Sequence, residues 1–454
     1  DTIAGITLAS LYNANPCWDF ISGKLCLYEK KIVRMLGGLV EWSNADGFVV
    51  TGGKQTLAYA IKNGMGRAGA NNPGEIHQYV VICSAVAHYS IEHVCSYLGI
   101  TPDNCIRVDS LPTGEINLED LKKRLEHSIS QGKKIAAVIA VAGATINLIP
   151  DPILLIKKTI DQVTKDYNLD YTPYLHVDSV ITWTWLAFKG NLPKENPTIA
   201  RKVESVLSEL IGIKYADSFA ADFHKTGFCP YAAGVFIAKE PTSLLGMTTR
   251  GYLPLENPSF GELEPFRQTF ENSRSSLPIV SIWIAIRRMG LEGFRQYVLY
   301  QLEVCETFKQ KIREKYNDHF EIINGHSNGW EIVLKPHFQG KLSWDQLQKS
   351  SVEEQQDYIM DCYTFMNDCW YSPFEEEALR YPVIGFIPKY SRKGIHEKSF
   401  PALLIHPTSL HYDDKAIEEM LDRIFHVKAT FELKGERLTT ASVQEKHLAM
   451  APPR

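Results

Sequence analysis

Strand-like apolar runs alternate, in the first half of the chain, with segments whose apolar residues recur at helical spacing. The strand-like runs are residues 47–51, 77–84, 134–143, 174–179 and 232–238, and helical patterns follow the first three. Runs as apolar as these are usually buried on both faces, as in parallel sheets covered by helices. The alternation therefore predicts an α/β fold, a largely parallel sheet with helices on both faces.

The pattern changes near residue 291, where a long helical segment leads to the strand-like FEIIN and GWEIVLKP. The 454 residues also exceed one typical core, so we expect two domains. The expected parts are an N-terminal segment over 1–45 that packs on a partner subunit, a large cofactor-binding domain over 46–290, a small α/β domain over 291–427, and a C-terminal arm or tail over 428–454.

Composition argues against several classes of partner. The formal net charge is −5 and no long basic run occurs, so we expect neither nucleic acid nor an anionic membrane as a partner. We find no secretory signal and no apolar run of about twenty residues. The nine cysteines form no CxxC pair and no Cys/His cluster at zinc spacing, which predicts reduced thiols and no metal site. We expect a cytoplasmic protein that acts on small molecules.

A short polar segment, DFHKTG at 222–227, lies between two apolar segments. Burial lowers the pKa of a lysine, so Lys225 at the mouth of a buried strand would be suited to form a Schiff base with an aldehyde. An isolated His-Lys pair is more often part of a solvated loop. Lys225 alone leaves both interpretations open.

Three further polar features lie where strands of such a sheet would end. Gly52 and Gly53 precede a helix, where backbone N–H groups and the helix dipole favour an anion. His88 lies in the loop before a helix, where open α/β sheets place ligand groups. Asp178 ends an apolar strand, where a carboxylate needs a structural salt bridge or a cofactor's protonated ring nitrogen. The GxGxxG and GxxxxGK[ST] fingerprints are absent, which argues against NAD and P-loop nucleotides.

Taken together, these features occur in the order and spacing of pyridoxal-phosphate enzymes of the aspartate-aminotransferase fold. The segments YNANPCWDF, EKKIVRML, ADSFAADFHKTGFCPY and ENSRSSLP resemble more narrowly those of the group II amino acid decarboxylases, which include glutamate and aromatic amino acid decarboxylases. The resemblance runs from about residue 10 to about residue 425. It implies fold type I, with a mostly parallel seven-stranded sheet in the large domain and a smaller C-terminal α/β domain, assembled as a homodimer.

The resemblance also implies residue roles around pyridoxal 5′-phosphate. Lys225 would hold the cofactor as an internal aldimine, His88 would stack on the pyridine ring, and Val180 would lie on its other face. Asp178 would keep the ring nitrogen protonated, so that the ring acts as an electron sink. The backbone around Gly52 and Gly53 would receive the phosphate, helped by Ser218 and His224. We also expect Lys54 at the phosphate, on its own position rather than on the resemblance.

Two positions depart from the family pattern. Lys54 stands where the decarboxylases usually have Ser or Thr, and it could pair with the phosphate or point away from it. Asp222 stands where many relatives have Asn. A carboxylate beside a phosphate is repulsive unless Lys54 or an arginine compensates.

Three residues are candidates for contact with the substrate. Tyr252, in a segment of loop composition, could deliver a proton, although a surface tyrosine fits equally well. Arg274 could bind the substrate carboxylate. Trp183 could form an apolar wall or belong to the core.

The reaction implied by the resemblance is decarboxylation of an L-amino acid, aromatic or acidic, to the amine through an external aldimine and a quinonoid. An aminotransferase or a carbon–carbon lyase is an alternative, because the cofactor permits all of these reactions and the protein selects among them. A catalytically reduced protein that binds pyridoxal phosphate is a second alternative, which Lys54 and Asp222 keep open.

Overall fold

The computed structural model describes residues 2–69, 73–248, 258–338, 342–370, 384–407 and 411–434. The chain divides into two compact units, the first comprising Asp1–Leu111 and Glu115–Val298 and the second Pro112–Gly114 and Leu299–Arg454. Helix α10 (Leu277–Lys315) runs from the first unit into the second and is kinked at Gly290, whose φ is 57°. The change of pattern near residue 291 lies just after this kink.

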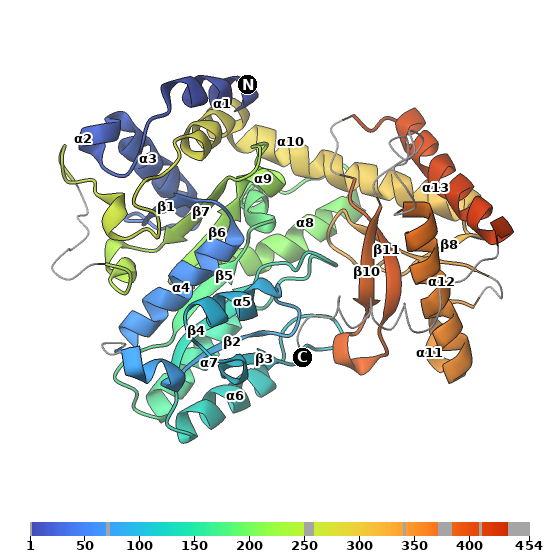
Figure 1. The fold of residues 1–454 in the computed structure, drawn as a ribbon, viewed down its shortest axis with the longest axis horizontal. Coiled ribbons are helices and arrows are strands. Elements are labelled where there is room, and N and C mark those ends of the chain that lie inside the picture. The colour runs from blue at the N-terminus through green and yellow to red at the C-terminus, as the bar shows by residue number, and fades with distance from the viewer. Residues whose placement is uncertain are drawn as a thin grey trace. The chain divides into compact units, whose positions relative to one another are not determined.

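A seven-stranded sheet forms the centre of the first unit, in the order β1-β7-β6-β5-β4-β2-β3 (Figure 1). Its strands are β1 (Asp46–Val50), β2 (Tyr79–Ser84), β3 (Cys105–Val108), β4 (Lys134–Val141), β5 (Tyr174–Asp178), β6 (Ser218–Asp222) and β7 (Gly234–Ala238). Strands β3, β2, β4, β5 and β6 pair in parallel, whereas β7 is antiparallel to both β6 and β1. The predicted mostly parallel seven-stranded sheet is confirmed.

Every residue of β1, β2, β5, β6 and β7 is buried, so both faces of this part of the sheet are covered. Helix α4 lies against β4 and β5, and α3 lies against β1 and β7. The side chains of Asn117 and Asn196 accept hydrogen bonds from the first N–H groups of α6 and α8 and so fix where these helices begin. The helices of the first unit are α1 (Thr2–Tyr12), α2 (Asp19–Ser22), α3 (Lys24–Leu39), α4 (Gly53–Arg67), α5 (Ser90–Tyr97), α6 (Leu118–Ser130), α7 (Ile153–Asp166), α8 (Pro197–Leu210) and α9 (Phe223–Thr226).

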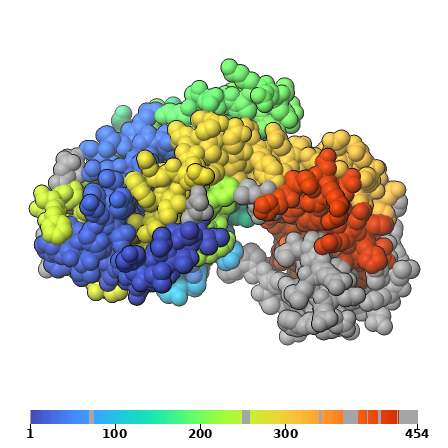
Figure 2. Space-filling model, turned by 90° about the horizontal axis from the view of Figure 1, so that it is seen from above, coloured from blue at the N-terminus to red at the C-terminus, as the bar shows by residue number. Residues whose placement is uncertain are grey.

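The N-terminal segment is tied to the residues just before α10. Trp18 Nε1 donates to Gly261 O at 3.0 Å, Gly261 N donates to Asp19 Oδ2 at 2.8 Å, and Arg274 N donates to Asn15 Oδ1 at 2.9 Å. Figure 2 shows the dark blue N-terminal residues beside the yellow segment on the surface. Segments far apart in sequence thus form one side of the first unit.

The second unit contains a four-stranded antiparallel sheet in the order β10-β11-β9-β8. Its strands are β8 (Phe320–Ile322), β9 (Ile332–Pro336), β10 (Gly385–Tyr390) and β11 (Phe400–Ile405), and its other helices are α11 (Trp344–Lys349), α12 (Val352–Trp370) and α13 (Asp414–Lys434). Among the described residues of both units, no helix is long and apolar enough to cross a membrane.

Candidate functional site

The site lies at one edge of the large sheet, where three parallel strands end. Strand β5 ends at Asp178, β6 ends at Asp222, and β1 runs into the Gly52–Gly53 turn that begins α4. The carboxyl ends of parallel strands form the usual ligand-binding edge of an α/β sheet. Features separated by more than a hundred residues therefore meet here.

Lys225 sits on α9, a single helical turn that directly follows β6. Its Nζ lies 3.1 Å from Asp222 Oδ2, and its side chain is 33% exposed whereas that of Asp222 is 1% exposed. The turn is anchored by the hydroxyl of Thr226, which donates to Ile181 O at 2.9 Å, and by the buried ring of Phe223. The structure thus places a reachable amine over a buried carboxylate, an arrangement unlike that of a freely solvated loop lysine.

Asp178 and His88 lie within electrostatic reach of Lys225. Asp178 is 9% exposed, and burial raises the pKa of its carboxyl while the charge of Lys225 opposes this shift. Desolvation, followed by the charge of Lys225, lowers the pKa of His88, so its imidazole is neutral near pH 7. The ring of His88 stacks on Tyr89 at a centroid distance of 4.3 Å, and its Nδ1 lies 2.8 Å from Ser90 Oγ. The structure therefore brings together Lys225, His88 and Asp178, as the sequence predicts.

The Gly52–Gly53 turn is so tight that a side chain at either glycine would have to displace its neighbours. Gly52 has a φ of 153°, and a Cβ there would lie 3.1 Å from Cε1 of His224. A Cβ on Gly53 would lie 2.9 Å from Cγ1 of Val180. Gly53 N donates a hydrogen bond to Asp222 Oδ2 at 3.2 Å. The turn thus forms a tight cradle whose backbone N–H already holds a carboxylate.

The imidazole of His224 lies beside Asp222, with Nε2 at 3.4 Å from Asp222 Oδ2. His224 Nδ1 lies 2.9 Å from Ala233 O, to which it can donate, and 3.1 Å from Ala233 N, which can donate to it, so the backbone of Ala233 holds the ring in either tautomer. Burial lowers the pKa of His224, and Asp222 opposes this shift. The ring also packs on Tyr231 at a centroid distance of 4.2 Å. His224 therefore lies at the cradle, where the sequence places it.

Two residues predicted at the phosphate point elsewhere. The ammonium of Lys54 contacts His93 Nδ1 and lies 5.4 Å from the ring centroid of Tyr97, both on α5. Ser218 is at the opposite end of β6 from Asp222, fully buried and 2.8 Å from His176 Nδ1. Four residues along a strand span about 13 Å, which puts Ser218 out of reach of the cradle. The expected place of Ser218 at the phosphate is corrected by these contacts, whereas Lys54 takes the second of the two orientations that the sequence leaves open.

The two described substrate candidates are also engaged in other interactions. Arg274 forms an ion pair with Glu29 and donates to Val49 O at 2.8 Å, and its side chain is 6% exposed. Trp183 is buried and packs on Phe223 at a centroid distance of 4.3 Å, so it supports α9 from the core. Neither side chain is free to line a substrate site. The third candidate, Tyr252, lies outside the described residues.

Gly234 is a site residue that the sequence reasoning missed. It lies opposite Asp222 in the pairing of β6 with β7, and a Cβ there would lie 2.6 Å from Asp222 Oδ1. A glycine opening the apolar run GVFIA was the available signal, because a glycine in a strand often marks a close approach of backbone.

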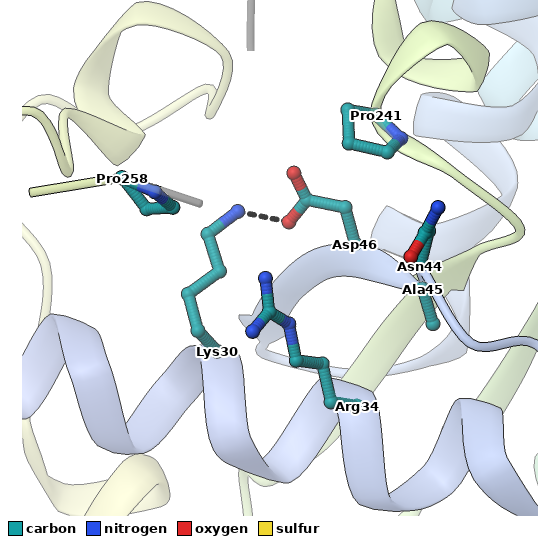
Figure 3. Close-up of a pocket in the computed structure, with 7 residues that line it drawn as sticks. All are labelled: Lys30, Arg34, Asn44, Ala45, Asp46, Pro241 and Pro258. Carbon is teal, nitrogen blue, oxygen red and sulfur yellow. Dashed lines mark hydrogen bonds and ion pairs between the residues drawn. The ribbon is translucent and has the colours of Figure 1, made fainter. Parts of the chain in front are cut away.

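A separate small pocket of the first unit lies at the other end of β1. In Figure 3, Lys30 and Arg34 extend from α3 toward Asp46, which begins the strand, and Lys30 forms an ion pair with Asp46. Its lining residues are Lys30, Arg34, Asn44, Ala45, Asp46, Pro241 and Pro258. This pocket is distinct from the lysine site. Across the described part of the chain, no group of three or more His, Cys, Asp or Glu residues could hold a metal ion.

Residues 3–334 match the family model of the pyridoxal-dependent decarboxylase conserved domain. A probable L-tyrosine/L-aspartate decarboxylase of Methanothermobacter thermautotrophicus is 23% identical over 287 residues, which cover 63% of this chain and 68% of the relative. An L-2,4-diaminobutyrate decarboxylase of Rhizobium meliloti is 25% identical over 314 residues, 69% of this chain and 58% of the relative. The matches thus span between roughly three fifths and two thirds of the length of these curated relatives.

Solved structures show the same fold. Mouse CSAD in its apo form superposes with a TM-score of 0.74 at 17% identity, covering 94% of this chain and 81% of that one. Oryza sativa TDC with PLP and tryptamine superposes with a TM-score of 0.73 at 12% identity, covering 95% and 81%. At these identities, the likeness concerns the fold.

Proposed function

Because the chain belongs to the pyridoxal-dependent decarboxylase family, as the match over residues 3–334 shows, we propose that it is a carboxy-lyase converting an L-amino acid to its amine. Its cofactor is pyridoxal 5′-phosphate, with which related structures have been solved. The observation that carries the proposal is the position of the Lys225 amine, 3.1 Å from Asp222 and within electrostatic reach of Asp178 and His88.

The residues at the ring end fit this cofactor. Lys225 presents an accessible amine for the aldehyde, and the one hydrogen bond that the described residues donate to the side chain of the buried Asp178 is long, 3.5 Å from Val180 N. Its carboxylate can therefore hold a proton on a ring nitrogen. His88 presents an imidazole face for stacking. When bound, the cofactor supplies an electron sink for the electron pair left by loss of carbon dioxide.

We infer an acidic L-amino acid as the first substrate class to test. Among the curated relatives, L-aspartate is named for the Methanothermobacter thermautotrophicus and Thermococcus kodakarensis proteins. L-Tyrosine and L-2,4-diaminobutyrate also occur among the relatives' substrates, so aromatic and basic amino acids belong in the same panel. Tyr252 remains our candidate for delivering the proton to the product.

We also propose a homodimer located in the cytoplasm. Helix α1 carries apolar residues around its whole circumference, and only Gly5 and Ala9 of it are buried. Leu8, Leu11 and Tyr12 are 57%, 78% and 83% exposed, a surface suited to a second copy of the chain. The cysteines whose side chains are described are free thiols, which is consistent with a reducing compartment.

The test is a panel of L-amino acids incubated with cofactor-loaded protein, with carbon dioxide and products measured together. Amine and carbon dioxide in equal amounts support the proposal, and Lys225→Ala should abolish both. Keto acid without carbon dioxide would instead identify an aminotransferase. Bound cofactor without turnover of any amino acid would identify a catalytically reduced protein.

A further inference from the structure

Asp222 occupies the anion cradle of the first unit. The cradle is the N-terminus of the fifteen-residue helix α4, whose free N–H groups and dipole favour a negative group. Gly53 N donates to Asp222 Oδ2 at 3.2 Å. A carboxylate of the protein thus takes a donor that the phosphate of the cofactor would need.

One oxygen of this carboxylate is left without a partner. Asp222 is 1% exposed, and its Oδ1 is buried with no hydrogen-bond partner among the described residues. A buried, unpaired carboxylate oxygen is costly, so the site favours either a donor or a proton there. A Cβ on Gly234 would lie 2.6 Å from Oδ1 and 2.9 Å from Cα of Gly52, so the glycine leaves the space that this oxygen occupies beside the cradle.

The groups around Asp222 come from four elements. Lys225 Nζ at 3.1 Å and His224 Nε2 at 3.4 Å belong to α9, and Gly53 N belongs to α4. Asp178 at the end of β5 and His88 after β2 are close enough for Asp222 to raise the pKa of each. Lys225 is thus the one lysine or arginine whose side chain forms an ion pair with Asp222 among the described residues.

Cofactor binding weakens two of the three interactions that favour ionised Asp222, those with Gly53 N and Lys225, and leaves the contact with His224. A phosphate in the cradle competes for Gly53 N, and Lys225 turns its nitrogen toward the aldehyde. We propose, on the basis of the function proposed above, that Asp222 takes up a proton when a phosphate monoester occupies the Gly52–Gly53 turn. The protonated carboxyl then donates a hydrogen bond to a phosphate oxygen, and Asp222 makes cofactor affinity fall as the pH rises.

The test uses pyridoxine 5′-phosphate, which lacks the aldehyde and so separates phosphate binding from bond formation at Lys225. Titration calorimetry in buffers of different ionisation enthalpy counts the protons exchanged. Asp222→Asn keeps the shape and removes the charge, Asp222→Ser serves if the amide variant does not fold, and Asp161→Asn, at an exposed position of α7, is the matched control.

On binding pyridoxine 5′-phosphate, the original protein should take up about one proton more than Asp222→Asn does. Its affinity for this compound should also fall about tenfold more, for each pH unit in the alkaline range, than that of the variant. At about pH 8, Asp222→Asn should bind pyridoxine 5′-phosphate at least about tenfold more tightly than the original protein does. Asp161→Asn should bind it with the affinity of the original protein. This inference would be overturned if the original protein and Asp222→Asn took up equal numbers of protons and showed the same dependence of affinity on pH. If the absorption band of the lysine-bound cofactor were still present, the proposed function would stand. If neither the original protein nor any variant bound pyridoxine 5′-phosphate or pyridoxal 5′-phosphate, both this inference and the proposed function would be overturned.

Discussion

The amine of Lys225 lies 3.1 Å from the carboxylate of Asp222, across the one turn of α9 that separates them. The contact holds the amine at the carboxyl edge of the sheet, because the carboxylate is buried and cannot move with it. The nucleophile toward an aldehyde is the neutral amine, so the pair must separate when the cofactor binds. The same contact therefore positions the lysine and opposes its reaction.

Lys225→Ala should abolish the visible absorption of cofactor bound through a carbon–nitrogen double bond, and with it all turnover. The reason is that no other described lysine lies beside both Asp178 and His88. Lys54→Ala is the control, because the ammonium of Lys54 contacts His93 rather than the cradle. It should change cofactor affinity by less than about tenfold, measured by absorbance titration. A larger loss in Lys54→Ala would show that this side chain turns to the phosphate.

Asp178→Asn should retain bound cofactor but lose decarboxylation rate. A neutral amide cannot hold the ring nitrogen in its protonated, electron-accepting form. A hydrogen bond to a charged group is worth roughly 1.5–3 kcal/mol, which corresponds to a rate loss of about tenfold to about a hundredfold. Single-turnover kinetics with saturating cofactor measure it, and an unchanged rate would remove Asp178 from the site.

Much of this site could be predicted from the sequence, because its members stand at strand ends. Lys225, His88 and Asp178 each follow an apolar run, and the parallel order of the strands alone brings such positions to one edge. Gly52 and Gly53 are recognisable for the same reason. The order and direction of the strands, rather than the direction of individual side chains, decide where these five residues lie.

The errors arose where side-chain direction decides the location. Lys54 is one residue beyond Gly53, but one step along a helix turns a side chain by about 100°, and this one points to α5. Ser218 and Asp222 share one short strand but lie at its opposite ends. Arg274 pairs with Glu29, a partner 245 residues away that no local pattern reveals.

Arg274→Met should destabilise the protein rather than weaken substrate binding alone. It leaves Glu29, 2% exposed at its side chain, as an unpaired buried charge. Removing one partner of a buried pair costs roughly 3–5 kcal/mol, measured by urea unfolding. Arg274→Met combined with Glu29→Gln should recover part of that loss. If Arg274→Met keeps full stability and only raises the KM, the arginine serves the substrate after all.

Acid should destabilise the protein partly through His176. Burial lowers the pKa of this histidine to about 3 in the folded chain, against 6.5 for an unperturbed histidine. Between these pH values the unfolded chain binds a proton at His176 that the folded chain does not bind. The contribution of His176 to the free energy of unfolding is therefore complete above about pH 6.5 and is lost as the pH falls. The slope is about 1.4 kcal/mol per pH unit.

Between about pH 6 and about pH 4, His176→Gln should make the free energy of unfolding depend less steeply on pH, by the equivalent of about one proton. Urea unfolding at each pH measures this dependence. His127→Gln, at an exposed position on α6, is the control and should leave the slope unchanged. An unaltered slope in His176→Gln would assign the acid sensitivity to other groups.

Charge on the exposed face of α1 should break the proposed dimer. Leu8 and Leu11 are largely exposed, whereas Gly5 of the same helix packs so closely on Ile284 of α10 that a Cβ would lie 2.1 Å from it. The helix is therefore fixed on one side and uncovered on the other. Burying a leucine contributes roughly 1.5–3 kcal/mol, so Leu8→Glu with Leu11→Glu should weaken association at least about a hundredfold.

Sedimentation velocity of the double variant should show a monomer at concentrations where the original protein is a dimer. Leu155→Glu, at a leucine of α7 that is 45% exposed, adds charge elsewhere on the first unit and should leave the dimer intact. Two further measurements separate loss of assembly from loss of fold. A double variant that is monomeric but folded should keep the circular dichroism spectrum and the cofactor absorption per chain of the original protein. A dimer of unchanged affinity in the double variant would move the interface away from α1, and a fully active monomer of the original protein would refute the dimer itself.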